Sequence, residues 1–194
     1  MVRASGTECR GNTWDGGIIP SQGPIIYLDN ANRMRLLEKK VLVLLTDGVD
    51  HAEYAQIRKG FEREEATVMV TSPQESLSIE TISGSRRGPD ILVDIPFEAV
   101  EELAFDGLII PDGILSTELM RKDVRVITMI HGFHQKQLPI FASGNAVQLL
   151  YDSQVLSEQV VVREGTPLGL FVDKAVEVLL DRAPYSHIYR PTMA

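Results

Sequence analysis

Apolar positions beyond residue 39 follow two alternating patterns, one typical of buried strands and one of amphipathic helices. Continuous apolar runs of strand length are typical of parallel strands covered on both faces; they are VLVLLTD (41–47), ATVMVTS (66–72), FDGLIIPDG (105–113) and PIFASG (139–144). Apolar residues also recur at helical spacing between these runs; they are Tyr54, Ile57 and Phe61 in one segment and Val126, Met129, Ile130 and Phe133 in another. The pattern therefore predicts strands that alternate with helices.

The remaining segments complete this alternation. Asp50 precedes the first helical segment, 51–65, and is placed to cap it. Residues 78–97 predict a β excursion around a Gly/Pro turn, and EQVVV (158–162) predicts the last strand. Thr166 as N-cap and Pro167 at the first helical position start a final helix; its apolar stripe consists of Leu168, Phe171, Val172, Ala175, Val176 and Leu179.

Strands and helices that alternate with short links predict a parallel sheet with helices on both faces. We therefore expect one α/β domain over residues 39–183. Residues 1–38 are rich in Gly, Ser and Pro without a period and predict an irregular arm, and 184–194 form a C-terminal tail. Ligands of such sheets bind where the strands end, which directs attention to the exits at 47–53, 111–115 and 143–147.

Composition narrows the classes of function. The net charge of -8 and the isolated basic pairs argue against a nucleic-acid surface. Cys9 is the only cysteine, so no intramolecular disulfide forms, which suits a reducing cytoplasm. The sequence contains no continuous apolar run of about 18 residues, so it predicts no membrane-spanning helix. The first 20 residues contain no apolar segment of the kind found in secretory signals. We expect a cytoplasmic protein without nucleic-acid or membrane partners.

Three segments, in chain order, resemble the ThiJ/PfpI superfamily. They are VLVLLTDGVDHAEY (41–54), ILVDIPFEAVEELAFDGLIIPDG (91–113) and LPIFASGNAVQLL (138–150), and the resemblance runs from about residue 40 to residue 180. It implies a flavodoxin-like three-layer α/β/α sandwich with a mostly parallel sheet, the glutamine amidotransferase-like fold, often as a dimer. Members of the superfamily include cysteine-dependent peptidase-like, glyoxalase-like, deglycase-like and chaperone-like proteins.

The sequence departs from this superfamily at the positions that carry its chemistry. The strand-to-helix elbow of the family holds a cysteine, which falls here on Gly144, and the next family position falls on Asn145. Glycine has no side chain that attacks a carbonyl or carries a thiolate. The family's acid, usually Glu, falls on Asp50. A glycine whose amide helps to form the oxyanion pocket falls on Asp112, where a carboxylate repels a developing oxyanion.

A deletion accompanies these substitutions. Between the elbow helix and the VVV strand the family has a longer segment, replaced here by YDSQVLSE (151–158). A Ser-Arg strand that usually precedes the last helix is replaced by REGTP (163–167). The resemblance implies that part of the pocket wall is missing.

Ser143 and the Asp50–Glu53 pair each allow two interpretations. Ser143 is a substitute nucleophile or a strand-end residue that faces a helix or its own backbone; no general base lies near it in the motif. Asp50 and Glu53 are a catalytic pair or a capping box, in which Asp50 accepts from the Glu53 amide and Glu53 reaches back. The capping box accounts for both residues without a function, although Asp50 lines a remnant pocket in either case.

Metal and thiol chemistry have weaker signals. Asp50, His51 and Asp112 are of types that bind divalent ions, yet Pro-Asp-Gly by itself favours a solvated turn. His131 and His134 share a helix face near its C-terminus, where histidines interact with the last carbonyls. Cys9 lies in the arm, away from the elbow. We predict no metal and no cofactor.

These observations predict a catalytically inactive superfamily member that acts through ligand binding or oligomeric assembly. The alternative is a hydrolase or lyase that uses carboxylates or Ser143 at the remnant site of Asp50, Asp112, Gly144 and Asn145. A glutamine amidotransferase relative is a third hypothesis, and the missing cysteine argues against it equally. Apolar residues in the arm and aromatic residues in the tail PYSHIYRP (184–191) predict a homo-oligomer, most simply a dimer.

Overall fold

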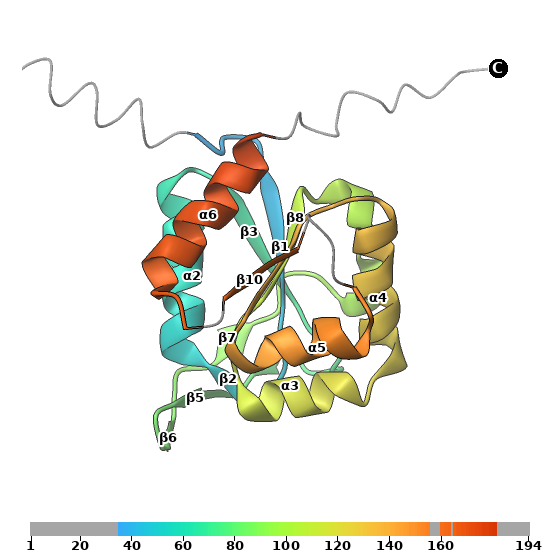
Figure 1. Cartoon of the computed structure of the whole chain (residues 1–194). Helices are drawn as coiled ribbons and strands as arrows, with labels where there is room; N and C mark the ends of the chain where they lie inside the picture. The colour runs from blue at the N-terminus through green and yellow to red at the C-terminus, as the bar shows by residue number, and fades with distance from the viewer. Residues whose placement is uncertain (1–34, 156–159, 164, 182–194) are drawn as a thin grey trace, which may run out of the picture. The chain divides into compact units, whose positions relative to one another are not determined.

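A five-stranded parallel sheet forms the centre of the computed structural model, which describes residues 35–155, 160–163 and 165–181. The strands lie in the order β10-β9-β8-β1-β3 (Figure 1). Their bounds are β1 Lys40–Leu44, β3 Thr67–Thr71, β8 Gly107–Ile110, β9 Ile140–Ser143 and β10 Val160–Arg163. Alternate residues of β1 enter opposite faces, so Val41 and Val43 join one apolar core while Leu42 and Leu44 join the other.

Helices cover both faces of this sheet, which confirms the predicted α/β/α sandwich (Figure 1). On one face α2 (His51–Arg63) packs against α6 (Leu168–Leu180), and on the other lies α4 (Val124–Gln135). The helices α3 (Ile114–Arg121) and α5 (Val147–Asp152) contact each other beyond the ends of β8 and β9. The predicted apolar stripe of α4, from Val126 to Phe133, is buried.

The predicted β excursion forms two small sheets outside the central one. In the first, β2 (Val49–Asp50) pairs with β5 (Thr81–Ser83), which pairs with β6 (Arg86–Arg87). In the second, β4 (Ser78–Ile79) pairs antiparallel with β7 (Ile91–Leu92). Two short 3-10 helices follow, η1 (Phe97–Ala99) and η2 (Glu102–Ala104). The Asp47 carboxylate accepts a hydrogen bond from the Glu80 amide at 2.7 Å. This contact connects the excursion to the segment that follows β1.

One predicted helix start is wrong. Pro167, not Thr166, occupies the N-cap of α6, and the helix begins at Leu168 without a side-chain cap. The Thr166 carbonyl instead accepts from Arg163 Nε at 2.8 Å. The predicted arm, apart from residues 35–38, and the C-terminal tail lie outside the described residues, as does Cys9. Within the described part of the chain, no helix is both long enough and apolar enough to cross a bilayer.

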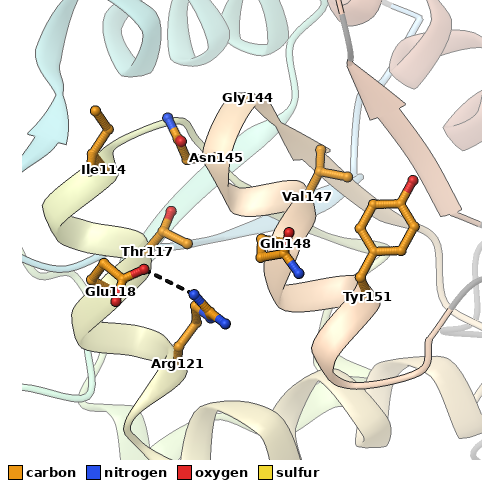
Figure 2. A pocket seen from close by; sticks show the side chains of 9 residues that line it. All are labelled: Ile114, Thr117, Glu118, Arg121, Gly144, Asn145, Val147, Gln148 and Tyr151. Carbon is orange, nitrogen blue, oxygen red and sulfur yellow. Dashed lines mark hydrogen bonds and ion pairs between the residues drawn. The ribbon is translucent and has the colours of Figure 1, made fainter.

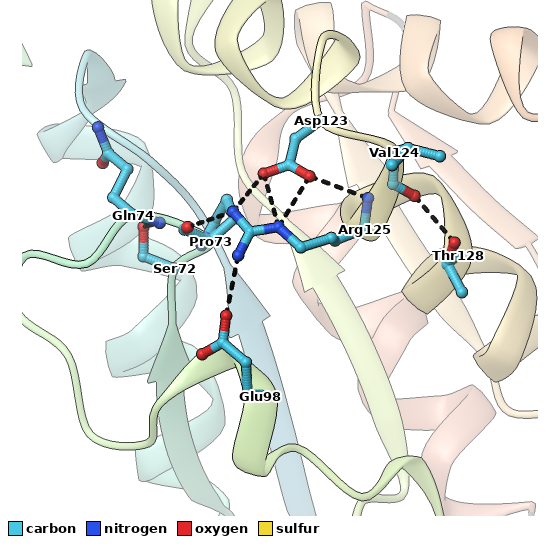
Figure 3. A network of polar contacts seen from close by, with 8 residues as sticks. All are labelled: Ser72, Pro73, Gln74, Glu98, Asp123, Val124, Arg125 and Thr128. Atoms are coloured by element: carbon cyan, nitrogen blue, oxygen red, sulfur yellow. Dashed lines mark hydrogen bonds and ion pairs between the residues drawn. The ribbon is translucent and has the colours of Figure 1, made fainter.

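A polar network fixes the start of α4 (Figure 3). Asp123 caps the helix by accepting from the Arg125 amide at 2.9 Å. The Arg125 guanidinium binds the Asp123 carboxylate, the Pro73 carbonyl and Glu98 at 2.7, 2.7 and 2.8 Å, and it lies 5.6 Å from the ring centre of Phe97. The Arg125 side chain lowers the pKa of Asp123 more than partial burial raises it.

The effect of pH on stability should therefore differ between the parent and Asp123→Asn, because asparagine keeps the cap but loses the charge. At pH 7 we expect the free energy of unfolding of the variant to be about 0.5–1 kcal/mol lower than that of the parent. The folded carboxyl has the depressed pKa, so its contribution is present above its ordinary pKa of about 4 and is lost as the pH falls through the folded value. Urea unfolding from pH 7 to pH 2 measures this. A gap between the two proteins that does not close in acid, or an equal gap for Asp173→Asn on the exposed side of α6, contradicts the assignment.

Candidate functional site

Three strand exits meet at one edge of the sheet, as the alternation of strands and helices predicts. The exit of β1 supplies Asp50, the exit of β8 supplies Asp112, and the exit of β9 supplies Gly144 and Asn145. Their backbones are joined directly, since the Asp50 amide donates to the Asp112 carbonyl at 2.9 Å. Asp112 contacts Asn145, and both line the same hollow as Asp50, so the three exits contribute to one site.

Asp50 caps α2 as predicted, but the second half of the predicted capping box is wrong. Asp50 Oδ1 accepts from the Glu53 amide at 3.0 Å. The Glu53 side chain does not return to the Asp50 amide, which already donates to Asp112. Glu53 instead turns beneath the strand exits. The physical reason is that its carboxylate has three donors there, one of them a charged guanidinium, while the Asp50 amide is already used.

The Glu53 carboxylate holds the floor of the site together. It is 8% exposed, and its Oε1 accepts from the Asp112 amide at 2.9 Å and from the Ser143 hydroxyl. Its Oε2 pairs with Arg163 Nη1 at 2.6 Å, so the last strand is also tied to α2. Ser143 is fully buried and its hydroxyl is used in this contact, which agrees with the strand-end interpretation.

Gly144 forms the elbow between β9 and α5 with a positive φ of 54°, a conformation that side chains other than glycine's rarely adopt. A short 3-10 turn, η3 (Gly144–Ala146), leads into α5. A Cβ added at Gly144 would overlap the Asp112 carboxyl carbon and its Oδ2, and would lie 2.5 Å from Oδ1. The Asp112 carboxylate thus fills the space into which a side chain at position 144 would project.

Asp112 also uses the hydrogen-bond donors of this elbow. Its Oδ1 accepts from the Gly113 amide at 2.7 Å, and from the amide and the side-chain nitrogen of Asn145, both at 2.8 Å. Its Oδ2 has no hydrogen-bond partner among the described residues. Two backbone amides and one side-chain amide thus form a cradle of the kind that stabilises an oxyanion, and a carboxylate of the same chain occupies it.

A family model described as the DJ-1/PfpI family matches residues 39–162. The chain belongs to the DJ-1/PfpI family. General stress protein 18 of Bacillus subtilis is 28% identical over 118 residues, which are 61% of this chain and 66% of that protein. Protein/nucleic acid deglycase 2 of Escherichia coli is 27% identical over 120 residues, which are 62% and 67% of the two chains. The matched region thus spans about two thirds of these relatives.

Two other comparisons cover more of the chain. Catalase HPII of Pseudomonas aeruginosa is 22% identical over 152 residues, which are 78% of this chain but only 21% of the catalase. The solved structure of oxidized DJ-1 from Toxoplasma gondii covers 73% of this chain and 90% of its own, with 22% identity and a TM-score of 0.64. This structural similarity confirms the fold that the sequence predicts.

Two hollows flank the elbow of this DJ-1/PfpI protein. The first, which we term the elbow hollow, has a volume of about 450 Å³; its lining residues are Gly48, Asp50, Ile82, Gly84, Asp112, Gly113, Ile114, Leu115, Glu118 and Asn145. The second, the interhelix hollow between α3 and α5, has about 270 Å³; Figure 2 labels its lining residues, which are Ile114, Thr117, Glu118, Arg121, Gly144, Asn145, Val147, Gln148 and Tyr151. The two hollows share Ile114, Glu118 and Asn145.

The site thus contains Asp50, Asp112, Gly144 and Asn145, with Glu53 and Ser143 directly beneath them. His131 and His134 are on α4 and line neither hollow. Among the described residues, no three His, Cys, Asp or Glu side chains are grouped closely enough to hold a metal ion. Sequence reasoning missed Arg163 and did not foresee the contacts of Glu53. The signal available in the sequence was Arg163 itself, a cation directly after the last predicted strand, which needs an acidic partner.

Proposed function

We propose that this DJ-1/PfpI protein lacks the thiol chemistry of an elbow cysteine and acts by binding a small molecule beside the elbow. The observation that carries this proposal is the position of Asp112. Its carboxylate fills the space next to Gly144 and accepts from the Gly113 and Asn145 amides. Both requirements of acyl-type catalysis, a nucleophile at the elbow and vacant donors for the oxyanion, are therefore unmet.

The relation to a catalase supports a role other than independent catalysis. The matched region covers 78% of this chain but about a fifth of the catalase. A unit of this kind thus occurs as a small part of a larger protein. Homo-oligomeric assembly and a cytoplasmic location belong to the same proposal and stay predictions.

A hydrolase that uses carboxylates is the second candidate, and the same residue favours it. Asp112 Oδ2 stands where the side chain of an elbow nucleophile would begin and has no partner among the described residues. The difficulty is that Oδ1 of the same carboxylate occupies the cradle, which leaves no donor for an oxyanion. Ser143 is less suited still, because it is fully buried and donates to Glu53.

A turnover assay with methylglyoxal tests the proposal. We expect the parent protein and Cys9→Ser to consume no more methylglyoxal than buffer does, while the E. coli deglycase that resembles this chain serves as an active control. Turnover by the parent that is lost in Cys9→Ser would place the arm's thiol in the site and overturn the proposal. Turnover that survives in Cys9→Ser but is lost in Asp112→Asn would support the carboxylate-dependent enzyme in its lyase form instead.

A further inference from the structure

The elbow hollow has a charge and a shape that point to one class of ligand. We infer that it binds a small organic cation, an amine with an apolar body and one further hydrogen-bonding group. This inference rests on the proposed function, because it names the ligand of the same site. It is carried by four observations on the described residues: the lining charges, the apolar wall, the use of the cradle donors, and a buried hydroxyl without a partner.

Three carboxylates line the elbow hollow, and each has an oxygen left over. Asp50 and Asp112 use only Oδ1 in the contacts described above, and Glu118 uses Oε1 for Arg121 at 2.9 Å. No Lys, Arg or His is among the lining residues. Arg121 offsets the charge of Glu118 from outside the hollow, whereas Asp50 and Asp112 have no cationic partner among the described residues, so the potential in the hollow favours a positively charged ligand.

Three basic side chains on the surrounding elements are paired elsewhere, and Arg86, which precedes Arg87 on the same hairpin, does not line the hollow. Arg121 binds Glu118 and Asp152, and Arg163 binds Glu53 beneath the site. Arg87, on the hairpin that carries Ile82 and Gly84, pairs with Asp90. A ligand's ammonium group therefore has no competitor inside the hollow for the three free carboxylate oxygens.

An apolar wall faces these carboxylates. Ile114 is 72% exposed, Leu115 is 49% exposed and Ile82 is 37% exposed, although all three line one concave surface. Large apolar side chains gathered in a hollow of about 450 Å³ suit the body of a small molecule, since known ligand sites have about 300–1,000 Å³. A bare metal ion would leave this wall in contact with water.

The cradle argues against an anionic ligand. The amides of Gly113 and Asn145, together with the Asn145 side chain, would attract an anion, but Asp112 Oδ1 uses all three. An anion would have to displace a carboxylate of the protein and would then face Asp50 and Glu118. We therefore expect the hollow not to bind the anions that a vacant oxyanion cradle would bind.

A buried hydroxyl indicates where the ligand extends. Thr117 is 3% exposed, and its hydroxyl has no hydrogen-bond partner in the described part of the chain. An unpaired buried hydroxyl is costly, so it marks a place where a ligand gains a hydrogen bond. Thr117 lines the interhelix hollow (Figure 2), which shares Ile114, Glu118 and Asn145 with the elbow hollow. To reach Thr117, a ligand with its amine near Asp112 would have to extend from the elbow hollow into the interhelix hollow.

Three probes that differ in charge but share a phenol test the inference. They are tyramine, 4-ethylphenol and 3-(4-hydroxyphenyl)propionate, titrated into the full chain in a calorimeter at pH 7. We expect tyramine to bind at least about tenfold more tightly than 4-ethylphenol, a difference of about 1.4 kcal/mol, and the propionate not to bind. Tyramine binding should weaken as salt is added, because salt screens the carboxylates.

Variants locate the site. Asp50→Asn keeps the cap of α2 while it removes one charge, and Glu118→Gln removes another; we expect each to weaken tyramine about fivefold or more, on the scale of one charge-assisted hydrogen bond. Thr117→Val should weaken tyramine about two- to tenfold, as expected for one hydrogen bond, and leave phenethylamine unchanged. Glu177→Gln, on the exposed side of α6, is the matched control and should change nothing.

The outcomes separate the inference from the proposed function. Equal binding of the three probes, or tighter binding of the propionate, overturns the inference of a cationic ligand while leaving the absence of thiol chemistry untouched. Tyramine binding that Asp50→Asn and Glu118→Gln do not weaken also overturns it. Methylglyoxal turnover by the parent overturns the proposed function whichever probe binds.

Discussion

Gly144→Cys should lower the free energy of unfolding by about 2–4 kcal/mol, since it combines overpacking with an unfavourable backbone conformation. The new Cβ would overlap the Asp112 carboxyl group, which is held by three hydrogen bonds and has no room to retreat without losing them. The φ of 54° adds the second cost. Urea unfolding of the variant in a Cys9→Ser background measures the sum, and the variant should gain no methylglyoxal turnover.

Two controls divide this loss into its causes. Gly84→Cys has a similar φ of 62° but open space around the added Cβ, so it should cost only about 1 kcal/mol. The double variant Asp112→Gly/Gly144→Cys removes the overlap and should recover at least half of the loss. Additive effects of the two substitutions would mean that positions 112 and 144 do not compete for one space.

Glu53→Gln should cost about 2–4 kcal/mol, because it breaks a buried ion pair and leaves one partner charged. The substitution removes the charge that binds Arg163. It also places an NH₂ group either against both the Asp112 amide and the Ser143 hydroxyl or against the Arg163 guanidinium. The Arg163 side chain is 24% exposed, so water offsets part of the loss.

Glu62→Gln is the matched control for this prediction. Glu62 pairs with Arg58 at 2.7 Å on the exposed side of the same helix, and its loss should cost no more than about 0.5 kcal/mol. Equal losses of unfolding free energy for the two variants would show that the Glu53 contacts stabilise the fold no more than an exposed ion pair does. Arg163→Leu should lose stability by the same mechanism, and the double variant should lose less than the sum of the two single losses.

The fold could be predicted from the sequence because its signals are local and repeated. Each strand of the central sheet is a continuous apolar run, and the buried stripe of α4 follows helical spacing. The cap at Asp50 and the glycine elbow at Gly144 are likewise properties of a few neighbouring residues. The predicted start of α6 is wrong by one residue: Thr166 and Pro167 both suit a helix start, and in the structure Pro167 is the N-cap while the Thr166 carbonyl accepts from Arg163.

The interior of the site could not be predicted in the same way. Asp-x-x-Glu at 50–53 fits a capping box, and only the tertiary structure brings Arg163 and Ser143 to the Glu53 carboxylate. In the sequence, the two departures at Asp112 and Gly144 each indicate a loss of catalytic function. In the structure they compensate for each other in volume, since the carboxylate gained at one position fills the space vacated at the other. The signal in the sequence for this compensation is that a glycine position gains a side chain at 112 while a side-chain position becomes glycine at 144.

A crystal structure of the full chain tests the central claim most directly, because the claim concerns which atoms occupy the cradle. We predict the Asp112 carboxylate beside Gly144, with one oxygen within hydrogen-bond distance of the amides of Gly113 and Asn145. An Asp112 side chain turned away from the elbow, with a bound anion or water on those amides, would contradict the account.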